Sequence, residues 1–462
     1  MNINTQPLFP MGTEVSSKDD VCAICLDYFH GHDVAPVDAD KTKCMTHCRH
    51  TFHLGCLTSQ YFTKPIGSRQ CAMCRQNPMP VKNQSTSQSH PDKFFPDETF
   101  YDACIQGDYD QVDKSLAEGV NINAVMKYGL TALMLGSCSG NRTVIERQLN
   151  AGAKVGATRT GDGLTALLIA VLEGKTECAQ LLIDKGADLK SIPPLLIEVL
   201  MGNTEKVRTL IADGADLNAD VWGTTPLLLA AMKGNTECLQ LLIEKGATLE
   251  TARTSDGSTP LFVAVWKGNT DCAEILIKSG ANLDARDNYG STPLFLAAEE
   301  NHTDIGKLLI DAGANLNLPR TLDGTTPLFL VASHENSTDF VELLLNAGAN
   351  PNTPRTSDGT TPLYMAAQEG NTQCVKLLLN AGANPNTALP DGATPLFIAA
   401  LKGNVECLKL LLNFGADLKA TRYWDGATAL SIAIKKGNND CAEALIKAEA
   451  AEGTNKGYCV IL

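Results

Sequence analysis

The chain lacks both a long apolar run and a basic N-terminal region. No stretch reaches the roughly 18 apolar residues that a membrane-spanning helix needs, and the opening MNINTQPLFPMGTEVSSKDD has no basic region leading into an apolar segment. We therefore expect a protein that is made in the reducing cytosol. The chain also lacks positive net charge: 38 Lys and Arg against 52 Asp and Glu give -14. This acidity makes nucleic acid a poor partner.

Cysteine is not scarce, but its distribution argues against a disulfide scaffold. Seven of the 16 cysteines lie between Cys22 and Cys74, eight are spread singly through the body of the chain, and Cys459 stands alone near the end. A reducing compartment does not favour disulfides. The first cluster therefore suggests metal binding, and the scattered thiols suggest packing.

The body of the chain is a repeat. The segment GTTPLLLAAMKGNTECLQLLIEKGATLE is followed directly by GSTPLFVAVWKGNTDCAEILIKSGANLD, and about eleven such units of roughly 33 residues follow one another. Each unit predicts a helix that begins at Thr-Pro, a turn at Gly-Asn (the corner), a second helix, and a helix end at Gly-Ala. Leu and Ala recur at i, i+3 and i+4, so the apolar faces are buried by stacking neighbouring units.

These units resemble the ankyrin repeat, over residues 97–450. The resemblance implies a mostly α-helical solenoid that binds a protein. The family usually carries His after Thr-Pro-Leu, whereas this chain has Phe, Leu or Tyr there. Six cysteines recur at the start of the second helix, where we expect buried packing residues: Cys178, Cys238, Cys272, Cys374, Cys407 and Cys441.

Five of the loops between units carry an extra residue and read Arg-Thr-x-Asp or nearly so. Their arginines are Arg159, Arg253, Arg320, Arg355 and Arg422. Two interpretations stay open. Each Arg pairs locally with the Asp three residues on, or the five form a row of exposed guanidinium groups that binds carboxylates of a partner.

The head of the chain carries eight thiols and imidazoles in short paired spacings. They occur in CAIC, CRHTFHLGC and CAMCR. Eight such groups supply two complete tetrahedral sets, which predicts two structural zinc ions as the cofactors. Cys44 and His47 are spare candidates beside the second set, and His30 and His32 are expected in a solvated loop.

The order Cys, Cys, Cys, His, His, Cys, Cys, Cys resembles the RING finger of the two-histidine type. The resemblance implies interleaved ligand sets, the first being Cys22, Cys25, His53 and Cys56, and the second Cys48, His50, Cys71 and Cys74. It implies a ubiquitin-protein ligase that positions a charged ubiquitin-conjugating enzyme and has no covalent catalytic residue of its own. Ile24 and Leu57 match the family's contacts with that enzyme, and Arg75 matches its linchpin arginine.

Two positions depart from the RING pattern. The family's groove tryptophan is replaced by Gln60, with Tyr61 and Phe62 nearby, and the usual Pro close to the last ligand is replaced by Ala72. These departures favour an alternative function, a non-enzymatic, membrane-tethered ankyrin scaffold or adaptor in which the zinc head is only a binding module.

The chain ends in CVIL, which fits the C-terminal prenylation box. Cys459 would carry the lipid, and the final Leu462 indicates a geranylgeranyl chain. A single lipid group attaches a protein to a membrane only reversibly, so we expect the protein at the cytoplasmic face of membranes with a cytosolic pool. The combination of ankyrin repeats with ubiquitin machinery also resembles effectors of intracellular bacteria, in which case the membranes are those of the host cell.

The predicted organisation has five parts. They are a disordered tail at 1–20, the RING-type finger at 21–76, a flexible linker at 77–96, the ankyrin array at 97–450 and a tail with the prenylation box at 451–462. The predicted function is a RING-type ubiquitin-protein ligase. Its head recruits the conjugating enzyme with ubiquitin, its array holds the substrate, and its lipid tethers it to membranes.

Overall fold

The computed structural model describes residues 96–159, 162–334 and 337–456, together with the backbone of four short strands nearer the N-terminus. The chain divides into two compact units, 1–192 and 193–462, and each is taken by itself. Among the described residues, no helix has the length and apolar character required to cross a bilayer.

The four strands of unit 1 form one antiparallel sheet in the order β2-β1-β3-β4. They are β1 (Lys43–Met45), β2 (Thr51–His53), β3 (Val81–Asn83) and β4 (Ser89–His90). β1 pairs with β2 so that Lys43 lies opposite His53, and β3 pairs with the other edge of β1. β3 and β4 fall within 77–96, the segment predicted to be a flexible linker. Backbone pairing holds a segment whose polar composition favours a spacer.

The helices of unit 1 form three consecutive pairs. They are α2 (Glu98–Gln106) with α3 (Tyr109–Ala117), α4 (Ala132–Ser139) with α5 (Arg142–Asn150), and α6 (Ala166–Leu172) with α7 (Thr176–Asp184); a short 3-10 helix, η2 (Lys127–Gly129), precedes α4.

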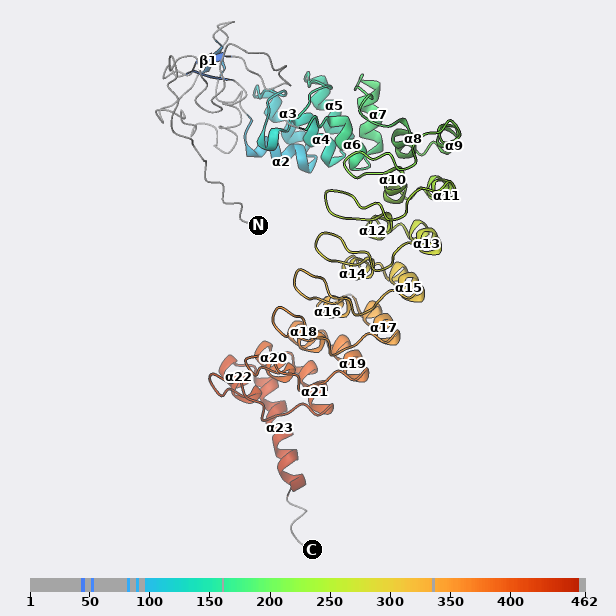
Figure 1. The fold of residues 1–462 in the computed structure, drawn as a ribbon. Helices are drawn as coiled ribbons and strands as arrows, with labels where there is room; N and C mark the ends of the chain where they lie inside the picture. Colours follow the sequence, from blue (N-terminus) through green and yellow to red (C-terminus); the bar gives the residue numbers. More distant parts are fainter. Residues whose placement is uncertain are drawn as a thin grey trace, which may run out of the picture. The chain divides into compact units, whose positions relative to one another are not determined.

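Unit 2 continues the same pattern with eight pairs among its described residues (Figure 1). They are α8 (Pro194–Met201) with α9 (Thr204–Ala212), α10 (Pro226–Lys233) with α11 (Thr236–Glu244), α12 (Pro260–Trp266) with α13 (Thr270–Lys278), α14 (Pro293–Glu299) with α15 (Thr303–Asp311), α16 (Pro327–Ala332) with α17 (Thr338–Asn346), α18 (Pro362–Glu369) with α19 (Thr372–Asn380), α20 (Pro395–Lys402) with α21 (Val405–Asn413), and α22 (Ala429–Lys436) with α23 (Asn439–Lys456). α23 runs past residue 450, so the predicted tail begins inside a helix, because the Ala- and Glu-rich sequence there is a good helix former.

Local sequence explains where the first helix of a pair begins. In α12 the side chain of Thr259 accepts a hydrogen bond from the backbone N–H of Phe262, and Pro260 occupies the first turn, where no N–H is needed. Thr292 caps α14 in the same way. The predicted Thr-Pro helix starts are therefore confirmed.

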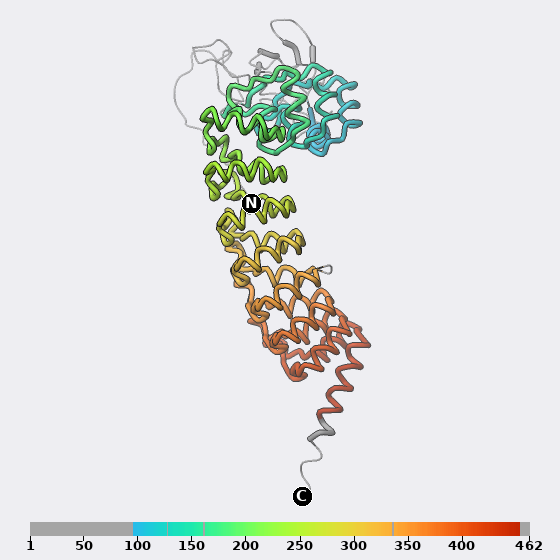
Figure 2. The backbone as a smooth tube through the Cα atoms, turned by 90° about the vertical axis from the view of Figure 1, so that its right-hand side faces the viewer, coloured from blue at the N-terminus to red at the C-terminus, as the bar shows by residue number. Residues whose placement is uncertain are grey.

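We call the first helix of each pair the inner helix and the second helix the outer helix. Inner helices pack on inner helices, as α12 does on α10 and α14, and outer helices pack on outer helices, as α13 does on α11 and α15. Figure 1 shows α12, α14, α16 and α18 in one column and α13, α15, α17 and α19 in another, and Figure 2 shows successive pairs of unit 2 stacked one on the next. Buried Leu, Ala and Phe side chains fill the space between the pairs.

Asparagine side chains join successive pairs. The amide of Asn269, at the corner before α13, donates to the carbonyls of Ala231 and Met232 at the end of α10, at 2.7 and 3.1 Å. Asn404 does the same for Ala367 and Gln368. These bonds give the carbonyls at the end of the inner helix a side-chain donor from the next pair.

The recurring cysteines are packing residues, as predicted. Cys178, Cys238, Cys272, Cys374, Cys407 and Cys441 are buried and free. Burial raises the pKa of the Cys178 and Cys272 thiols to about 11. A thiol that stays protonated at neutral pH is a weak nucleophile, so these positions fill space between outer helices.

Candidate functional site

The structure and the sequence point to different parts of the chain. Of the predicted zinc ligands, the structure describes only the backbone of His53, the last residue of β2. The other seven ligands, the contact residues Ile24, Leu57 and Arg75, and the lipidation residue Cys459 lie outside the described residues. Within the described part of the chain, no cluster of His, Cys, Asp and Glu could hold a metal ion.

The five arginines of the row lie in the finger loops, which we define as the segments between an outer helix and the next inner helix. The loop of Arg159 belongs to unit 1, and the loops of unit 2 project from its inner-helix side (Figure 1). In the loop that holds Arg320, the Arg320 N–H donates to the Thr325 carbonyl and the Gly324 N–H donates to the Arg320 carbonyl, both at 2.8 Å. Gly324 has a φ of 76°. Glycine accepts this left-handed conformation without strain, which closes the turn.

Each arginine of the row pairs with the aspartate three residues on. The pairs are Arg159–Asp162, Arg253–Asp256, Arg320–Asp323, Arg355–Asp358 and Arg422–Asp425. Arg320 donates to Asp323 through Nε and Nη2, at 3.1 and 2.7 Å, and the Asp323 carboxylate also accepts from the Thr325 N–H. The hydrogen bond from Arg355 lowers the pKa of Asp358 to about 2.

Three of these guanidinium groups also lie over an aromatic ring of the preceding repeat. Arg320 lies 4.9 Å from the centroid of Phe295, Arg355 lies 4.7 Å from Phe329, and Arg422 lies 5.0 Å from Phe397. These rings are buried, and they occupy the place where the family usually has His. The phenylalanine thus gives the next finger loop a cation–π contact.

The local pairing is therefore the interpretation that the structure supports for the arginine row. The side chain of Arg253 is 11% exposed and that of Arg355 is 25% exposed, so these groups are largely covered. Sequence reasoning found the arginines and their aspartates but missed the rings. The ring contacts could have been predicted from one pattern: a repeat with Phe after Thr-Pro-Leu is followed by a finger loop with Arg-x-x-Asp.

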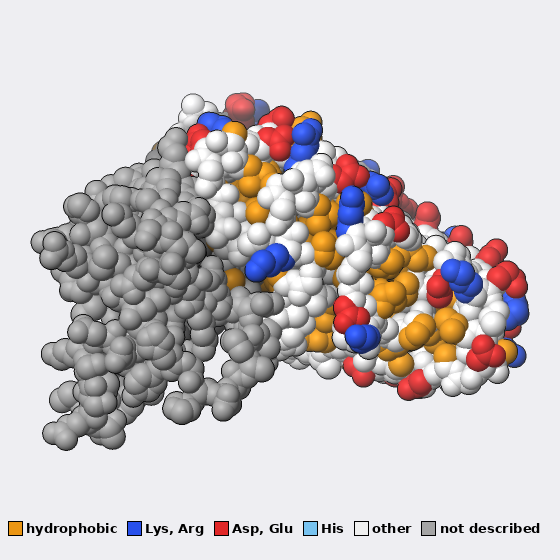
Figure 3. Space-filling model, turned by 90° about the horizontal axis from the view of Figure 1, so that it is seen from above, with side chains coloured by type: hydrophobic (Ala, Val, Ile, Leu, Met, Phe, Trp, Pro, Cys, Tyr) orange, Lys and Arg blue, Asp and Glu red, His pale blue; other side chains and the backbone are white. Residues whose placement is uncertain are grey.

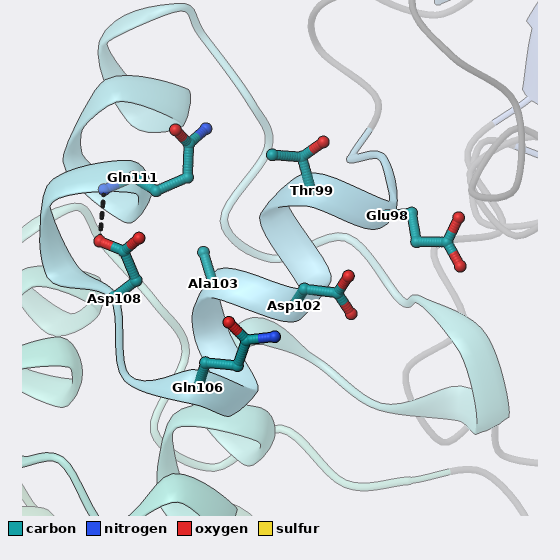
Figure 4. Close-up of a pocket in the computed structure, with 7 residues that line it drawn as sticks. All are labelled: Glu98, Thr99, Asp102, Ala103, Gln106, Asp108 and Gln111. Atoms are coloured by element: carbon teal, nitrogen blue, oxygen red, sulfur yellow. Dashed lines mark hydrogen bonds between the residues drawn. The ribbon is translucent and has the colours of Figure 1, made fainter. Parts of the chain in front are cut away.

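A second candidate site is a cavity of about 490 Å³ over α2 and α3. The side chains of Glu98, Asp102 and Gln106 project from one side of α2, whereas Asp108 turns back to accept from the Gln111 N–H (Figure 4). That hydrogen bond caps α3. Glu98 and Asp102 stand one helical turn apart on the surface, an arrangement that needs no ligand.

The surface itself is mixed. Hydrophobic side chains show between charged side chains of both signs in the space-filling view (Figure 3). Large apolar side chains that remain exposed include Trp222, Trp266, Tyr289, Leu322 and Trp424. Of these, Trp266, Tyr289 and Leu322 line one pocket, and such a cluster of apolar groups is a candidate for contact with another protein.

Comparison with known proteins settles the family of the array. The family model described as ankyrin repeats in three copies matches residues 100–192, 195–287, 250–320, 283–355, 318–389 and 363–457. The chain belongs to the ankyrin-repeat family. The predicted helical solenoid is thereby confirmed, and ankyrin repeats imply binding to a protein.

Two curated proteins are similar over a short span. The chain is 45% identical over 56 residues to the E3 ubiquitin-protein ligase TRAIP of Homo sapiens and to that of Mus musculus. The match covers 12% of this chain, and the chain spans about a tenth of the length of these relatives. Among solved structures, the crystal structure of the ankyrin repeat domain of Bcl-3, a unique member of the IkappaB protein family, is 26% identical with a TM-score of 0.44, covering 48% of this chain and 99% of that one.

Proposed function

We propose that this ankyrin-repeat protein is a RING-type ubiquitin-protein ligase. The observation that carries the proposal is the 45% identity to E3 ubiquitin-protein ligases over 56 residues, which is the length of the zinc finger predicted at 21–76. The eight Cys and His residues of that segment supply the donors that a two-zinc finger requires.

The donor set suits two zinc ions. β1 pairs with β2 from Lys43 opposite His53 to Met45 opposite Thr51. His53 of the first proposed set ends β2, and in the sequence it follows Cys48 and His50 of the second set. This order along the chain is compatible with the interleaved assignment. Each ion would have four protein ligands, leaving no open position for activated water, so its contribution is to stabilise the fold.

The proposed chemistry needs no nucleophile from this chain. Ile24 and Leu57 would contact the conjugating enzyme, and Arg75 would donate hydrogen bonds to both that enzyme and ubiquitin. Holding the charged ubiquitin in one orientation raises its rate of transfer, because the reacting groups are already placed for attack.

The test is self-ubiquitination of the full chain with a panel of conjugating enzymes. We expect Ile24→Ala to abolish transfer while two zinc ions stay bound, and Arg75→Ala to reduce it. Arg142→Gln, a change at an exposed ion pair of the array, serves as a matched control and keeps full activity. Transfer that both head variants leave unchanged would sink the assignment of these contacts.

The second candidate function is a non-enzymatic adaptor. Gln60 and Ala72, at the two positions that depart from the RING pattern, favour it because they alter the surface that would receive a conjugating enzyme. An adaptor would bind zinc and its partners but would not accelerate ubiquitin transfer with any enzyme of the panel.

The array and the tail define where a ligase would act. We propose that the ankyrin repeats hold the substrate and that a geranylgeranyl group on Cys459 attaches the chain reversibly to the cytoplasmic face of membranes. Cys459→Ser should move the protein to the cytosolic fraction of a prenylating host and leave transfer in solution unchanged. A Ser variant that still fractionates with membranes would contradict the tether.

A further inference from the structure

Unit 2 carries a groove of about 310 Å³ on the side of its inner helices. Inner helices α12 and α14 and the finger loops of three successive repeats form it. We call it the Trp266 groove, and the residues that matter here are Phe262, Trp266, Tyr289, Glu299, Glu300 and Leu322.

The groove has an unusual share of exposed apolar surface. Trp266 is 43% exposed, Tyr289 is 56% exposed and Leu322 is 66% exposed. At the position of Trp266, α18 has Gln368, although α10 and α20 have Met232 and Leu401, and at the position of Leu322 the next finger loop has Ser357. The solenoid therefore does not need these apolar groups for its own packing, and their gathering at one place marks a contact surface.

A change in the finger loop opens the groove. The loop after α13 is one residue shorter than the loop that holds Arg320, and its arginine, Arg286, donates to the carbonyls of Gly290 and Pro319 at 2.9 and 2.8 Å. Arg286 is thus held by backbone atoms. Phe262, which occupies the ring position that arginines cover in later repeats, instead lines the groove.

The charge of the groove is negative. Asp256, Asp287, Glu299 and Glu300 line it. Among the described residues of the lining, one is a cation, Arg320, and it is engaged by Asp323 at 2.7 Å and by Glu299 at 3.9 Å. Beside the lining, the ammonium of Lys267 lies 3.6 Å from the centroid of the Trp266 ring. Glu299 and Glu300 are exposed, so their carboxylates face solvent next to the apolar side chains.

We infer that the Trp266 groove binds an extended, basic and apolar segment of another protein. A large aliphatic or aromatic side chain of that segment covers Trp266, Tyr289 and Leu322, and a flanking Arg or Lys meets Glu299 and Glu300. Burial of apolar surface supplies the affinity, and charge complementarity selects the sequence and speeds encounter. The inference rests on the proposed function only in calling the bound segment a substrate.

The experiment measures fluorescence anisotropy of labelled peptides with the full chain. The probe is a twelve-residue peptide that alternates Leu and Arg, and two matched peptides replace its Arg by Glu or its Leu by Ser. We expect saturable binding of the Leu-Arg peptide that weakens with salt, and binding at least about tenfold weaker for the other two, since each loses one of the two contacts.

Variants locate the binding site. Glu299→Gln with Glu300→Gln, or Trp266→Gln with Leu322→Ser, should each weaken binding of the Leu-Arg peptide about tenfold. All but Glu300→Gln introduce a side chain that a sibling repeat carries natively, so the fold is kept. Glu369→Gln, which removes the carboxylate at the position of Glu300 two repeats further on, is the matched control and should change nothing.

The inference would be overturned if Glu369→Gln lost as much affinity for the Leu-Arg peptide as the groove variants do. It would also be overturned if the Ser-Arg peptide bound as tightly as the Leu-Arg peptide. Either result would show only general attraction of a basic peptide to an acidic protein. Self-ubiquitination is scored in parallel. If the chain transfers ubiquitin but does not bind the peptide, the peptide-binding inference is refuted and the ligase proposal stands. If it binds the peptide but does not transfer ubiquitin, the ligase proposal is refuted and the peptide-binding inference stands.

Discussion

The contact between Arg355, Asp358 and Phe329 gives a quantitative test of how the repeats hold together. The guanidinium carbon of Arg355 lies 4.7 Å from the centre of the Phe329 ring, and the ring is 3% exposed. A cation–π contact of this kind contributes about 0.5–1 kcal/mol when exposed and about 2 kcal/mol when desolvated, and a partly exposed ion pair contributes about 0.2–1 kcal/mol. Arg355→Gln should therefore lower the free energy of unfolding by about 1–2 kcal/mol.

The assay is urea unfolding followed by far-UV circular dichroism. Arg142→Gln is the control, because Arg142 pairs with Glu146 while nearly half of each side chain is exposed, and it should cost less than about 0.5 kcal/mol. A double-mutant cycle with Phe329→Leu isolates the ring contact and should give a coupling of about 0.5–1 kcal/mol. Zero coupling, or an Arg355→Gln variant as stable as the parent, would refute the reasoning.

Three further predictions concern pH, packing and metal. The pKa of Asp358 is lowered to about 2 in the folded protein, compared with about 4 in the unfolded chain. The stabilisation from its ionised carboxylate is therefore present above a pH of about 4 and is lost as the pH falls toward 2. Acid unfolding, followed by circular dichroism, should begin at lower pH in the parent than in Arg355→Gln. Gly306→Ala should destabilise α15 in a urea titration although Ala favours helices, because the added methyl would meet the ring of Phe340, and Phe340→Leu should recover part of the loss; a more stable Ala variant would contradict this packing. Cys22→Ser or Cys71→Ser should unfold the head and leave the helical signal of the array, while metal analysis of the parent gives two zinc ions per chain; fewer would contradict the interleaved ligand sets.

The array can be predicted from the sequence because the signals that begin and end its helices lie close together in the chain and recur in successive repeats. Thr259 and Pro260 fix a helix start by capping and by a preset φ, and both effects act within one turn. The cysteine positions are predictable for a similar reason: even spacing at one place in a repeat indicates a buried face.

Contacts between repeats are less visible in the sequence. The stacking of Arg355 on Phe329 joins residues 26 positions apart, and neither residue type signals the other on its own. The same holds for β3, where Val81 to Asn83 read as polar spacer yet pair with β1. At the Trp266 groove, the finger loop is one residue shorter, Arg286 donates to the carbonyl of Pro319, and the largely buried Phe262 lines the groove.

The proposal that the chain is a RING-type ligase is tested most directly by discharge of ubiquitin from a preloaded conjugating enzyme onto free lysine. The proposal predicts that the full chain accelerates discharge, that Ile24→Ala removes the acceleration while two zinc ions remain bound, and that chelation of zinc removes it as well. Discharge at the same rate with and without the zinc-loaded chain, across the panel of conjugating enzymes, would contradict ligase activity and leave the adaptor.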